Sequence, residues 1–331
     1  MIAACSLLKT LIDKHLIIPV GRVEYFYLYP FTFDEFLLAM GEEKMYEFLI
    51  NNEVPSFAHQ PLLKWFQRYT LIGGMPEIVR LFAETQDILQ LNTVYEGLLN
   101  SYLDDVEKYT RNATLRQVLR HCIRSAFFEA GKRIKFQGFG NSNYCSREVG
   151  EVLRTLEKAM LIRLIYPTTQ VKLPLMPNFK KAPKLQVLDT GLINYFVGLQ
   201  EELFRTPQID MVYEVKVSEH IVGQELVAQI HSQVRPLVFW TREKKQSSAE
   251  IDFLLSFHSQ IIPVEVKAGP MGKLRSLHLF MESVDHPFAI RVYSGSFRID
   301  EVKIPNGKRF KLINLPFYQI VNWQTVLEEM V

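Results

Sequence analysis

Three short acidic segments in the last third of the chain carry the residue types that bind divalent cations. They contain Glu225, Asp252 at the end of Ala249-Glu250-Ile251-Asp252, and Glu265 in Glu265-Val266-Lys267. Mg²⁺ takes carboxylate oxygens, and waters and substrate phosphate complete its shell. A lysine two residues beyond a ligand can position the attacking water or stabilise charge on the phosphate. The segments therefore predict a metal-dependent phosphodiesterase site with Mg²⁺ as cofactor. Its ligands would be Asp252, Glu265 and Glu225, and Lys267 and Glu225 would act in catalysis.

The segments that carry Asp252 and Glu265 are typical of a β-hairpin. Residues 251–256 and 261–267 are rich in β-branched and aromatic side chains, and the polar tip 257–260 joins them. If that tip forms the loop, Asp252 lies opposite Glu265 and Glu250 lies opposite Lys267. Because side chains alternate along a strand, these four would share one face, with residues 251, 253, 264 and 266 on the other. Opposed carboxylates repel, and a divalent cation would remove that repulsion.

An alternative interpretation stays open for each of these residues. Glu250 and Lys267 can form a plain cross-strand ion pair on a solvated face, with Asp252 at the surface. Glu225 falls in a helix expected over residues 217–230, among apolar residues at helical spacings. Because an unpaired buried carboxylate is costly, it would need a cation, a hydrogen-bond network or a raised pKa. Otherwise, Glu225 is a helix-end residue that reaches solvent.

The predicted elements around these residues follow a definite order. A helix with Glu225 precedes three strands, which are followed by a helix over 274–282 and a strand over 288–293. This order resembles the PD-(D/E)xK nuclease-like fold, αβββαβ. Residues 240–248 would form a basic turn between the first two strands, and its cations Arg242, Lys244 and Lys245 are candidates for contact with a phosphate backbone. The alternative is a solvated loop tip.

Charge divides the chain unevenly despite a net charge of only +2. Lysine plus arginine against aspartate plus glutamate number 8 and 15 in residues 1–110, 15 and 5 in residues 111–200, and 15 and 16 in the remainder. A strongly basic middle third is the electrostatic pattern of a region that faces nucleic acid or an acidic partner.

The basic third has a pattern of elements to match its charge. Helices are expected over 114–128 and 146–160, with Ser146 as the N-cap of the second, followed by a hairpin of strands over 161–166 and 185–188. Helix, helix, hairpin is the outline of a winged helix, whose second helix can enter a DNA groove. Arg147, Arg154 and Lys158 lie off its apolar face and are the candidate DNA contacts. Alternatively, the basic face docks the acidic first third of the same chain.

Several further features limit the range of functions. The first third reads as mostly helical, separated by proline and glycine. Three cysteines without metal or disulfide spacing, and the lack of a membrane-spanning apolar run or signal peptide, favour a cytoplasmic protein with no membrane contact. No Gly-x-x-x-x-Gly-Lys-Ser/Thr occurs, so ATP is not expected as a ligand. Asp189-Thr190-Gly191 is favoured as a helix N-cap and turn rather than a catalytic motif.

A set of short motifs resembles bacterial and archaeal AAA-type ATPases that carry a C-terminal nuclease-like domain of unknown function. In order, the motifs occupy residues 6–9, 21–24, 28–36, 73–77, 102–106, 189–192, 249–253, 263–267 and 314–318. The resemblance implies that the ATPase core would precede Met1, so the chain would be a truncated or naturally motor-less variant. It also implies that Arg22 resembles a nucleotide-sensing arginine, although pairing with an acidic neighbour is favoured.

Together these features predict an α+β multidomain protein. A helical, lid-like region over 1–110 would follow the ATPase core, a winged-helix-like basic domain would span 111–200, and a restriction-endonuclease-like domain would span 201–331. The expected function is a Mg²⁺-dependent DNA nuclease, with DNA as partner and either a homo-oligomer or an ATPase as assembly. A non-catalytic DNA-binding or adaptor module and an ATPase remnant remain as alternatives.

Overall fold

The N-terminal part of the chain is a layer of helices. The computed structural model describes residues 27–108, 112–200, 214–229, 236–244, 247–267 and 274–330. Within them, the layer consists of α2 (Phe33–Ala39), α3 (Glu43–Ile50), a 3₁₀ turn (Ser56–Ala58), α4 (His59–Ile72), α5 (Pro76–Thr85) and α6 (Ile88–Lys108). Local chemistry sets the helix starts. Glu35 accepts a hydrogen bond from the backbone amide of Thr32 just before α2, and Pro76 stands in the first turn of α5.

The second half of the chain builds one eight-stranded mixed sheet, in the order β2-β1-β3-β4-β5-β6-β8-β7. The strands are β1 (Ile162–Thr168), β2 (Lys184–Val187), β3 (Val238–Lys244), β4 (Ser247–Phe257), β5 (Gln260–Val266), β6 (Phe288–Tyr293), β7 (Arg298–Lys303) and β8 (Arg309–Pro316). β3, β4 and β5 form an antiparallel meander, and α12 (Arg275–Met281) carries the chain to β6, which lies parallel to β5. The predicted order of helix, three strands, helix and strand is therefore present.

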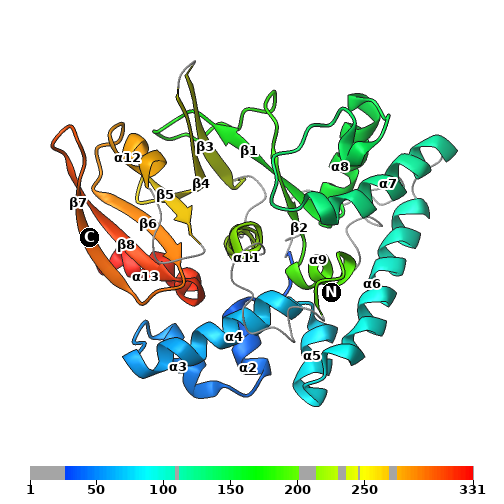
Figure 1. Ribbon diagram of the computed structural model, residues 1–331, viewed down its shortest axis with the longest axis horizontal. Helices are drawn as coiled ribbons and strands as arrows, with labels where there is room; N and C mark the ends of the chain where they lie inside the picture. Colours follow the sequence, from blue (N-terminus) through cyan, green and yellow to red (C-terminus); the bar gives the residue numbers. More distant parts are fainter. Residues whose placement is uncertain are drawn as a thin grey trace, which may run out of the picture.

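Two apolar cores lie on opposite faces of the sheet. The larger core includes Phe253 and Val264 and continues through α11 (Glu214–Ala228) into the N-terminal helices. The smaller includes Ile251 and lies beneath α12. Figure 1 shows α11 end-on at the centre, with sheet strands on two sides of it and α4 below. α11 is therefore the element through which the helical layer and the sheet meet.

A β-bulge in β4 changes the faces expected for its side chains. Val238 of β3 pairs with Leu254, but Trp240 pairs with Ile251, so β4 has one extra residue between these pairs. Ile251 consequently faces the α12 core while Phe253 faces the α11 core. The expectation that both share one face was wrong, because a bulge interrupts the alternation of side chains. The extra residue lies at Asp252 and Phe253, beside the candidate site.

The basic middle third contains all the elements predicted for it. α7 (Ala113–Glu129) and α8 (Ser146–Lys158) precede the antiparallel hairpin of β1 and β2. The N-cap of α8 is Cys145 rather than Ser146, because Glu148 accepts a hydrogen bond from the Cys145 amide. β1 also pairs in parallel with β3, so the hairpin belongs to the same sheet as the C-terminal strands. The boundary expected at residues 200 and 201 thus falls between strands of one sheet.

The loop between β1 and β2 lies against the C-terminal half of the sheet. Val171 and Leu175 pack against the core beneath α12, and Lys172 forms an exposed ion pair with Asp285. Bonds from the amide of Leu185 to the carbonyl of Lys132 and from Gly131 to Leu185 fix the start of β2. The loop therefore places Lys184, the first residue of β2, in a defined position.

Among the helices of the described residues, none is both long and apolar enough to cross a membrane.

Candidate functional site

Lys184 lies at the centre of a group of three carboxylates drawn from two elements. Its ammonium Nζ is 2.6 Å from Glu219 Oε1 on α11, 2.8 Å from Glu250 Oε1 on β4 and 3.4 Å from Asp252 Oδ1 on β4. The Lys184 side chain is only 6% exposed. The ion pairs therefore operate in a poorly solvated place, where an unpaired charge would be costly.

Asp252 lies where the ladder between β4 and β5 ends. The pairing runs from Phe257 and Gln260 to Phe253 and Val264, and it includes the predicted opposition of Ser256 to Ile261. One step further, the Asp252 carboxylate accepts a 2.8 Å hydrogen bond from the amide of Val266. The carboxylate thus takes the place of a backbone partner, and Asp252 is held beside the Glu265-Val266-Lys267 segment, as the sequence predicted.

Glu265 and Lys267 form the other side of the group. Lys267 Nζ is 2.6 Å from Glu265 Oε1, and the Lys267 side chain remains 29% exposed. Glu265 is buried, and its Oε2 has no hydrogen-bond partner among the described residues. We call these six residues the carboxylate–lysine cluster: Lys184, Glu219, Glu250, Asp252, Glu265 and Lys267. Glu250, expected opposite Lys267, instead contacts Lys184 and lies 3.5 Å from Arg133.

Burial and mutual repulsion shift the proton affinities of the cluster. Burial raises the pKa of Glu219 to about 7, Asp252 raises it further and Lys184 opposes the shift. Burial also raises the pKa of Glu265 to about 7, with Asp252 adding to the effect and Lys267 opposing it. Although burial lowers the pKa of Lys184, attraction by Glu219, Asp252 and Glu250 outweighs it and the net shift is upward. Lys184 is therefore a permanent cation at neutral pH.

The donor atoms of the cluster fit a hard divalent cation in kind. They are carboxylate oxygens, and the buried, unpartnered Glu265 Oε2 is an acceptor that such an ion would satisfy. The position among three of the carboxylates is already occupied by a cation, however, because the Lys184 ammonium lies there. Within the described ranges, no group of three or more His, Cys, Asp or Glu side chains is arranged to hold a metal ion. A metal could therefore bind here only after Lys184 moves.

Glu225, expected as a ligand or catalytic group, belongs to a different network. Its Oε1 is 2.6 Å from the Tyr69 hydroxyl of α4 and accepts a 3.2 Å bond from the amide of Phe33. Burial raises its pKa to about 8. The helical pattern placed Glu225 in an apolar arc correctly, but the arc faces the N-terminal helices rather than Asp252. The assignment of Glu225 to the metal site was therefore wrong.

The same network explains several of the motifs that prompted the family resemblance. Asp189 caps α9 (Thr190–Phe196) by accepting a bond from Leu192, and it also accepts a 2.7 Å bond from Gly74. Gln224, beside Glu225, accepts a bond from Thr190. These contacts join the helical layer to α9 and α11. The favoured interpretation of Asp189 as a helix cap is confirmed.

Sequence reasoning missed Glu219 and Lys184. Glu219 lies on α11, as Glu225 does, but it contacts Lys184 rather than the N-terminal helices. Lys184 is 68 residues from Asp252 in sequence, and it lies at a strand start with no distinctive spacing. The signal available for Glu219 was a second carboxylate on the predicted helix. Nothing local marked Lys184.

The residues expected to contact DNA are not all gathered at one place. Arg147, Arg154 and Lys158 are exposed on α8. Arg242 lies within β3, paired with Ala249, rather than in the expected turn, because β3 and β4 extend further than expected. Lys245, the side chain of Lys244, and Arg22 lie outside the described residues.

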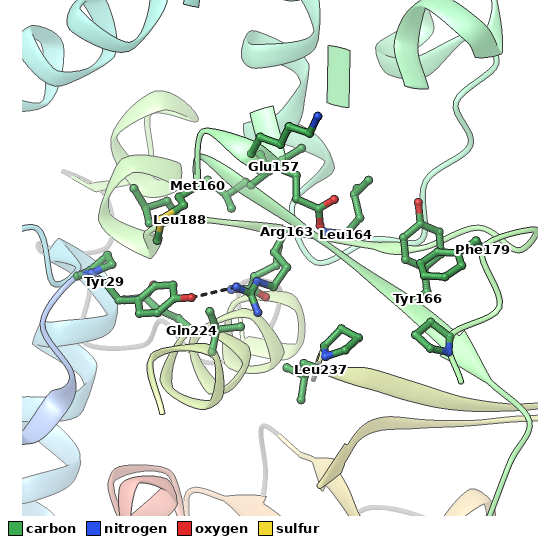
Figure 2. Close-up of a pocket in the computed structure, with 18 residues that line it drawn as sticks. Tyr29, Glu157, Met160, Arg163, Leu164, Tyr166, Phe179, Leu188, Gln224 and Leu237 are labelled. Carbon is green, nitrogen blue, oxygen red and sulfur yellow. Dashed lines mark hydrogen bonds between the residues drawn. The ribbon is translucent and has the colours of Figure 1, made fainter. Parts of the chain in front are cut away.

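A cavity of about 450 Å³ opens beside the end of α8 and is separate from the carboxylate–lysine cluster. Figure 2 shows Tyr29 and Arg163 joined by a hydrogen bond on one side and Tyr166 beside Phe179 on the other. The bond from Arg163 to the Tyr29 hydroxyl is 3.0 Å long. Burial raises the pKa of Glu157 in its wall. The lining includes none of the six cluster residues.

Two separate parts of the chain match models of known protein families. Residues 63–203 match a domain of unknown function, DUF8612. Residues 216–318 match DUF4143, a domain of unknown function. DUF4143 is often found at the C-terminus of AAA-ATPase-like proteins, in agreement with that part of the expected resemblance. The DUF4143 region holds all of the cluster except Lys184, which lies in the DUF8612 region. The search of curated proteins and the search of solved structures each gave no match.

Proposed function

We propose that the chain is a metal-dependent, nuclease-like phosphodiesterase that acts on DNA and has its reaction centre at the carboxylate–lysine cluster. The observation that carries the proposal is the arrangement of Asp252, Glu265 and Lys267 where the β4–β5 ladder ends. There Asp252 is held by the Val266 amide, and Lys267 pairs with a buried Glu265. The order of α11, β3, β4, β5, α12 and β6 supports assignment to the PD-(D/E)xK type.

Each residue of the cluster has a chemical role under this proposal. Asp252, Glu265 and Glu219 would hold Mg²⁺. When bound, this ion would place positive charge beside the phosphate and lower the pKa of a bound water. Lys267 is partly exposed, so its ammonium can reach both Glu265 and an entering phosphate oxygen. The buried strands behind Glu265 fix that carboxylate, so that little reorganisation is needed when charge develops.

Exposed cations on α8 support a DNA substrate. Arg147, Arg154 and Lys158 project from a helix in the most basic part of the chain. Cations of this kind bind phosphates without reading sequence, and their contribution falls as salt rises. An AAA-type ATPase is the assembly partner that the DUF4143 match favours.

Incubation with labelled linear, nicked and branched DNA tests the proposal. We expect Mg²⁺- or Mn²⁺-dependent cutting that falls by roughly 100-fold or more in Lys267→Ala, because groups that stabilise developing charge contribute on this scale. Asp252→Ala should also abolish cutting. Lys44→Ala, which removes an exposed lysine on α3, is the matched control and should cut normally. Metal-dependent cutting that survives both site substitutions would contradict the assignment of the reaction centre to this cluster.

Arg154→Ala and Lys158→Ala should each weaken binding to DNA of any sequence. Every lost phosphate contact should reduce the slope of log affinity against log salt by about 1. Fluorescence anisotropy with a labelled duplex, measured from low to moderate salt, gives that slope, and Lys44→Ala is again the control. An unchanged slope in both α8 variants would remove this helix from the DNA interface.

A second function is favoured by the position of Lys184. Since the ammonium of Lys184 already occupies the point where three carboxylates converge, the chain can instead be a non-catalytic DNA-binding or adaptor module. In that case Lys267→Ala would leave DNA binding unchanged, whereas Arg154→Ala would weaken it. The two variants therefore separate the enzyme from the module.

A further inference from the structure

We propose that the ammonium of Lys184 is the resident cation of the carboxylate–lysine cluster and that it competes with divalent metal ions for the cluster. The inference rests on the proposed function, since it concerns the same site. It assigns Lys184 a role that no feature of the sequence indicated: setting the affinity of the site for metal. The metal would bind Glu219, Asp252 and Glu265 in the fraction of molecules in which the Lys184 side chain has moved away.

The geometry around Lys184 is that of a filled cation position. Three carboxylate oxygens from α11 and β4 converge on one ammonium at 2.6, 2.8 and 3.4 Å. Convergence of carboxylates from separate elements on a single point is what a hard divalent ion requires. Here an amine on a long stem satisfies it. The neighbouring Glu265 Oε2 is buried and unpartnered, so one acceptor of the cluster lacks a cation.

The charge balance explains why the cluster tolerates Lys184 and why its removal would favour a metal. The four carboxylates of the cluster lie near three cations. Two of these are Lys184 and Lys267, and the third is the guanidinium of Arg133, which contacts Glu250. Removing the ammonium would leave Glu219 and Asp252 facing each other without the cation between them. Removing one partner of a buried ion pair destabilises the fold because the charge that remains is uncompensated. A divalent ion would then relieve the repulsion.

The backbone at Lys184 is anchored independently of the ammonium. Leu185 exchanges backbone hydrogen bonds with the segment Gly131–Lys132, and Lys184 itself forms an isolated bridge with Arg133. Its Nζ also lies 4.8 Å from the centre of the Phe239 ring, so an apolar stem of equal length has a partner there. Lys184→Met therefore keeps most of the apolar stem and removes the ammonium.

Mn²⁺ binding to the full chain tests the proposal. It is measured by calorimetry and by the electron paramagnetic resonance signal of free Mn²⁺. We expect Lys184→Met to bind one Mn²⁺ at least about tenfold more tightly than the wild type, because a site that is only fractionally open binds more weakly by that fraction. Lys180→Met, the same change at an exposed lysine of the same loop, should match the wild type. Glu219→Gln added to Lys184→Met should remove the gain.

Thermal unfolding gives a second reading. Without metal, Lys184→Met should melt below the wild type, and Mn²⁺ should restore it while leaving the wild type little changed. Equal Mn²⁺ affinity in the wild type and Lys184→Met, or the same gain in Lys180→Met, would overturn the proposal. If Lys184→Met does not fold, Lys184→Gln replaces it, and tight Mn²⁺ binding by the wild type would overturn the proposal by itself. A gain in Mn²⁺ affinity without DNA cutting would count against the nuclease and leave the role of Lys184 standing.

Discussion

Glu225→Gln is expected to raise the free energy of unfolding at pH 8 and to remove part of its pH dependence. The Glu225 carboxyl is fully buried between α11 and α4, and burial raises its pKa to about 8 from an ordinary value of 4.5. The Tyr69 hydroxyl, with one hydrogen, lies 2.6 Å from Glu225 Oε1 and 2.8 Å from the carbonyl of Phe31. A protonated Glu225 brings a second hydrogen and lets both contacts form.

The sign of the pH effect follows from which state holds the proton. Between pH 4.5 and about 8, the folded chain keeps the Glu225 proton while the unfolded chain has lost it. The part of the free energy of unfolding that depends on Glu225 is therefore fully present below pH 4.5. It falls by about 1.4 kcal/mol per pH unit as the pH rises to about 8. Glutamine is neutral throughout and keeps both a donor and an acceptor, so Glu225→Gln should lack this loss.

Urea unfolding of the wild type and Glu225→Gln at pH 5, 6, 7 and 8 measures the effect. The difference between the two proteins isolates Glu225, because Asp189, whose pKa burial raises to about 6, contributes equally to both. Glu151→Gln, at an exposed position on α8, is the matched control and should follow the wild type. Parallel curves for the wild type and Glu225→Gln would show that Glu225 is ionised when buried.

Gly191→Ala is expected to destabilise the chain by about 3 kcal/mol, at the upper end of overpacking effects. Gly191 lies in the first turn of α9, and a β-carbon there would overlap the carbonyl oxygen of Ile72 at the end of α4. That oxygen belongs to backbone and cannot move aside without shifting α4. The close approach of α4 and α9 therefore depends on the absence of a side chain at residue 191.

Gly97→Ala is the matched control for this change. Gly97 is also a helical glycine, in α6, and a β-carbon there would meet no atom within 4 Å. Alanine should stabilise the helix at this position by roughly 0.5 to 1 kcal/mol. Opposite signs for the two alanine substitutions in denaturant unfolding are the expected result. A neutral Gly191→Ala would mean that α4 and α9 are not in contact as described.

Local sequence patterns predicted the elements of this fold well. The helix expected over 274–282 and the strand expected over 288–293 correspond to α12 and β6. Each is specified by the periodicity of its own apolar residues and by flanking polar or turn residues, which are local features. The hairpin register was predicted for the same reason, since a short turn determines which residues pair, although the turn is His258-Ser259 and Phe257 pairs with Gln260.

The site was only partly predictable, because its composition depends on distant parts of the chain. Periodicity indicated that Glu225 is buried, but not that Tyr69 and Phe33 rather than Asp252 would surround it. A hydrogen-bond network and a raised pKa, two of the three solutions expected for a buried carboxylate, are both present. Lys184 reaches the site from a strand far away in sequence. The bulge at Asp252 depends on pairing with β3.

Cleavage of labelled DNA by Glu219→Gln and Glu225→Gln, assayed side by side with Mn²⁺, tests the central claim most directly. Both changes replace one carboxyl group of α11 with an amide, six residues apart. The carboxylate–lysine cluster includes Glu219 and excludes Glu225. The account predicts that Glu219→Gln loses metal-dependent cutting and that Glu225→Gln cuts at the wild-type rate. Loss of cutting in Glu225→Gln with full activity in Glu219→Gln would contradict it.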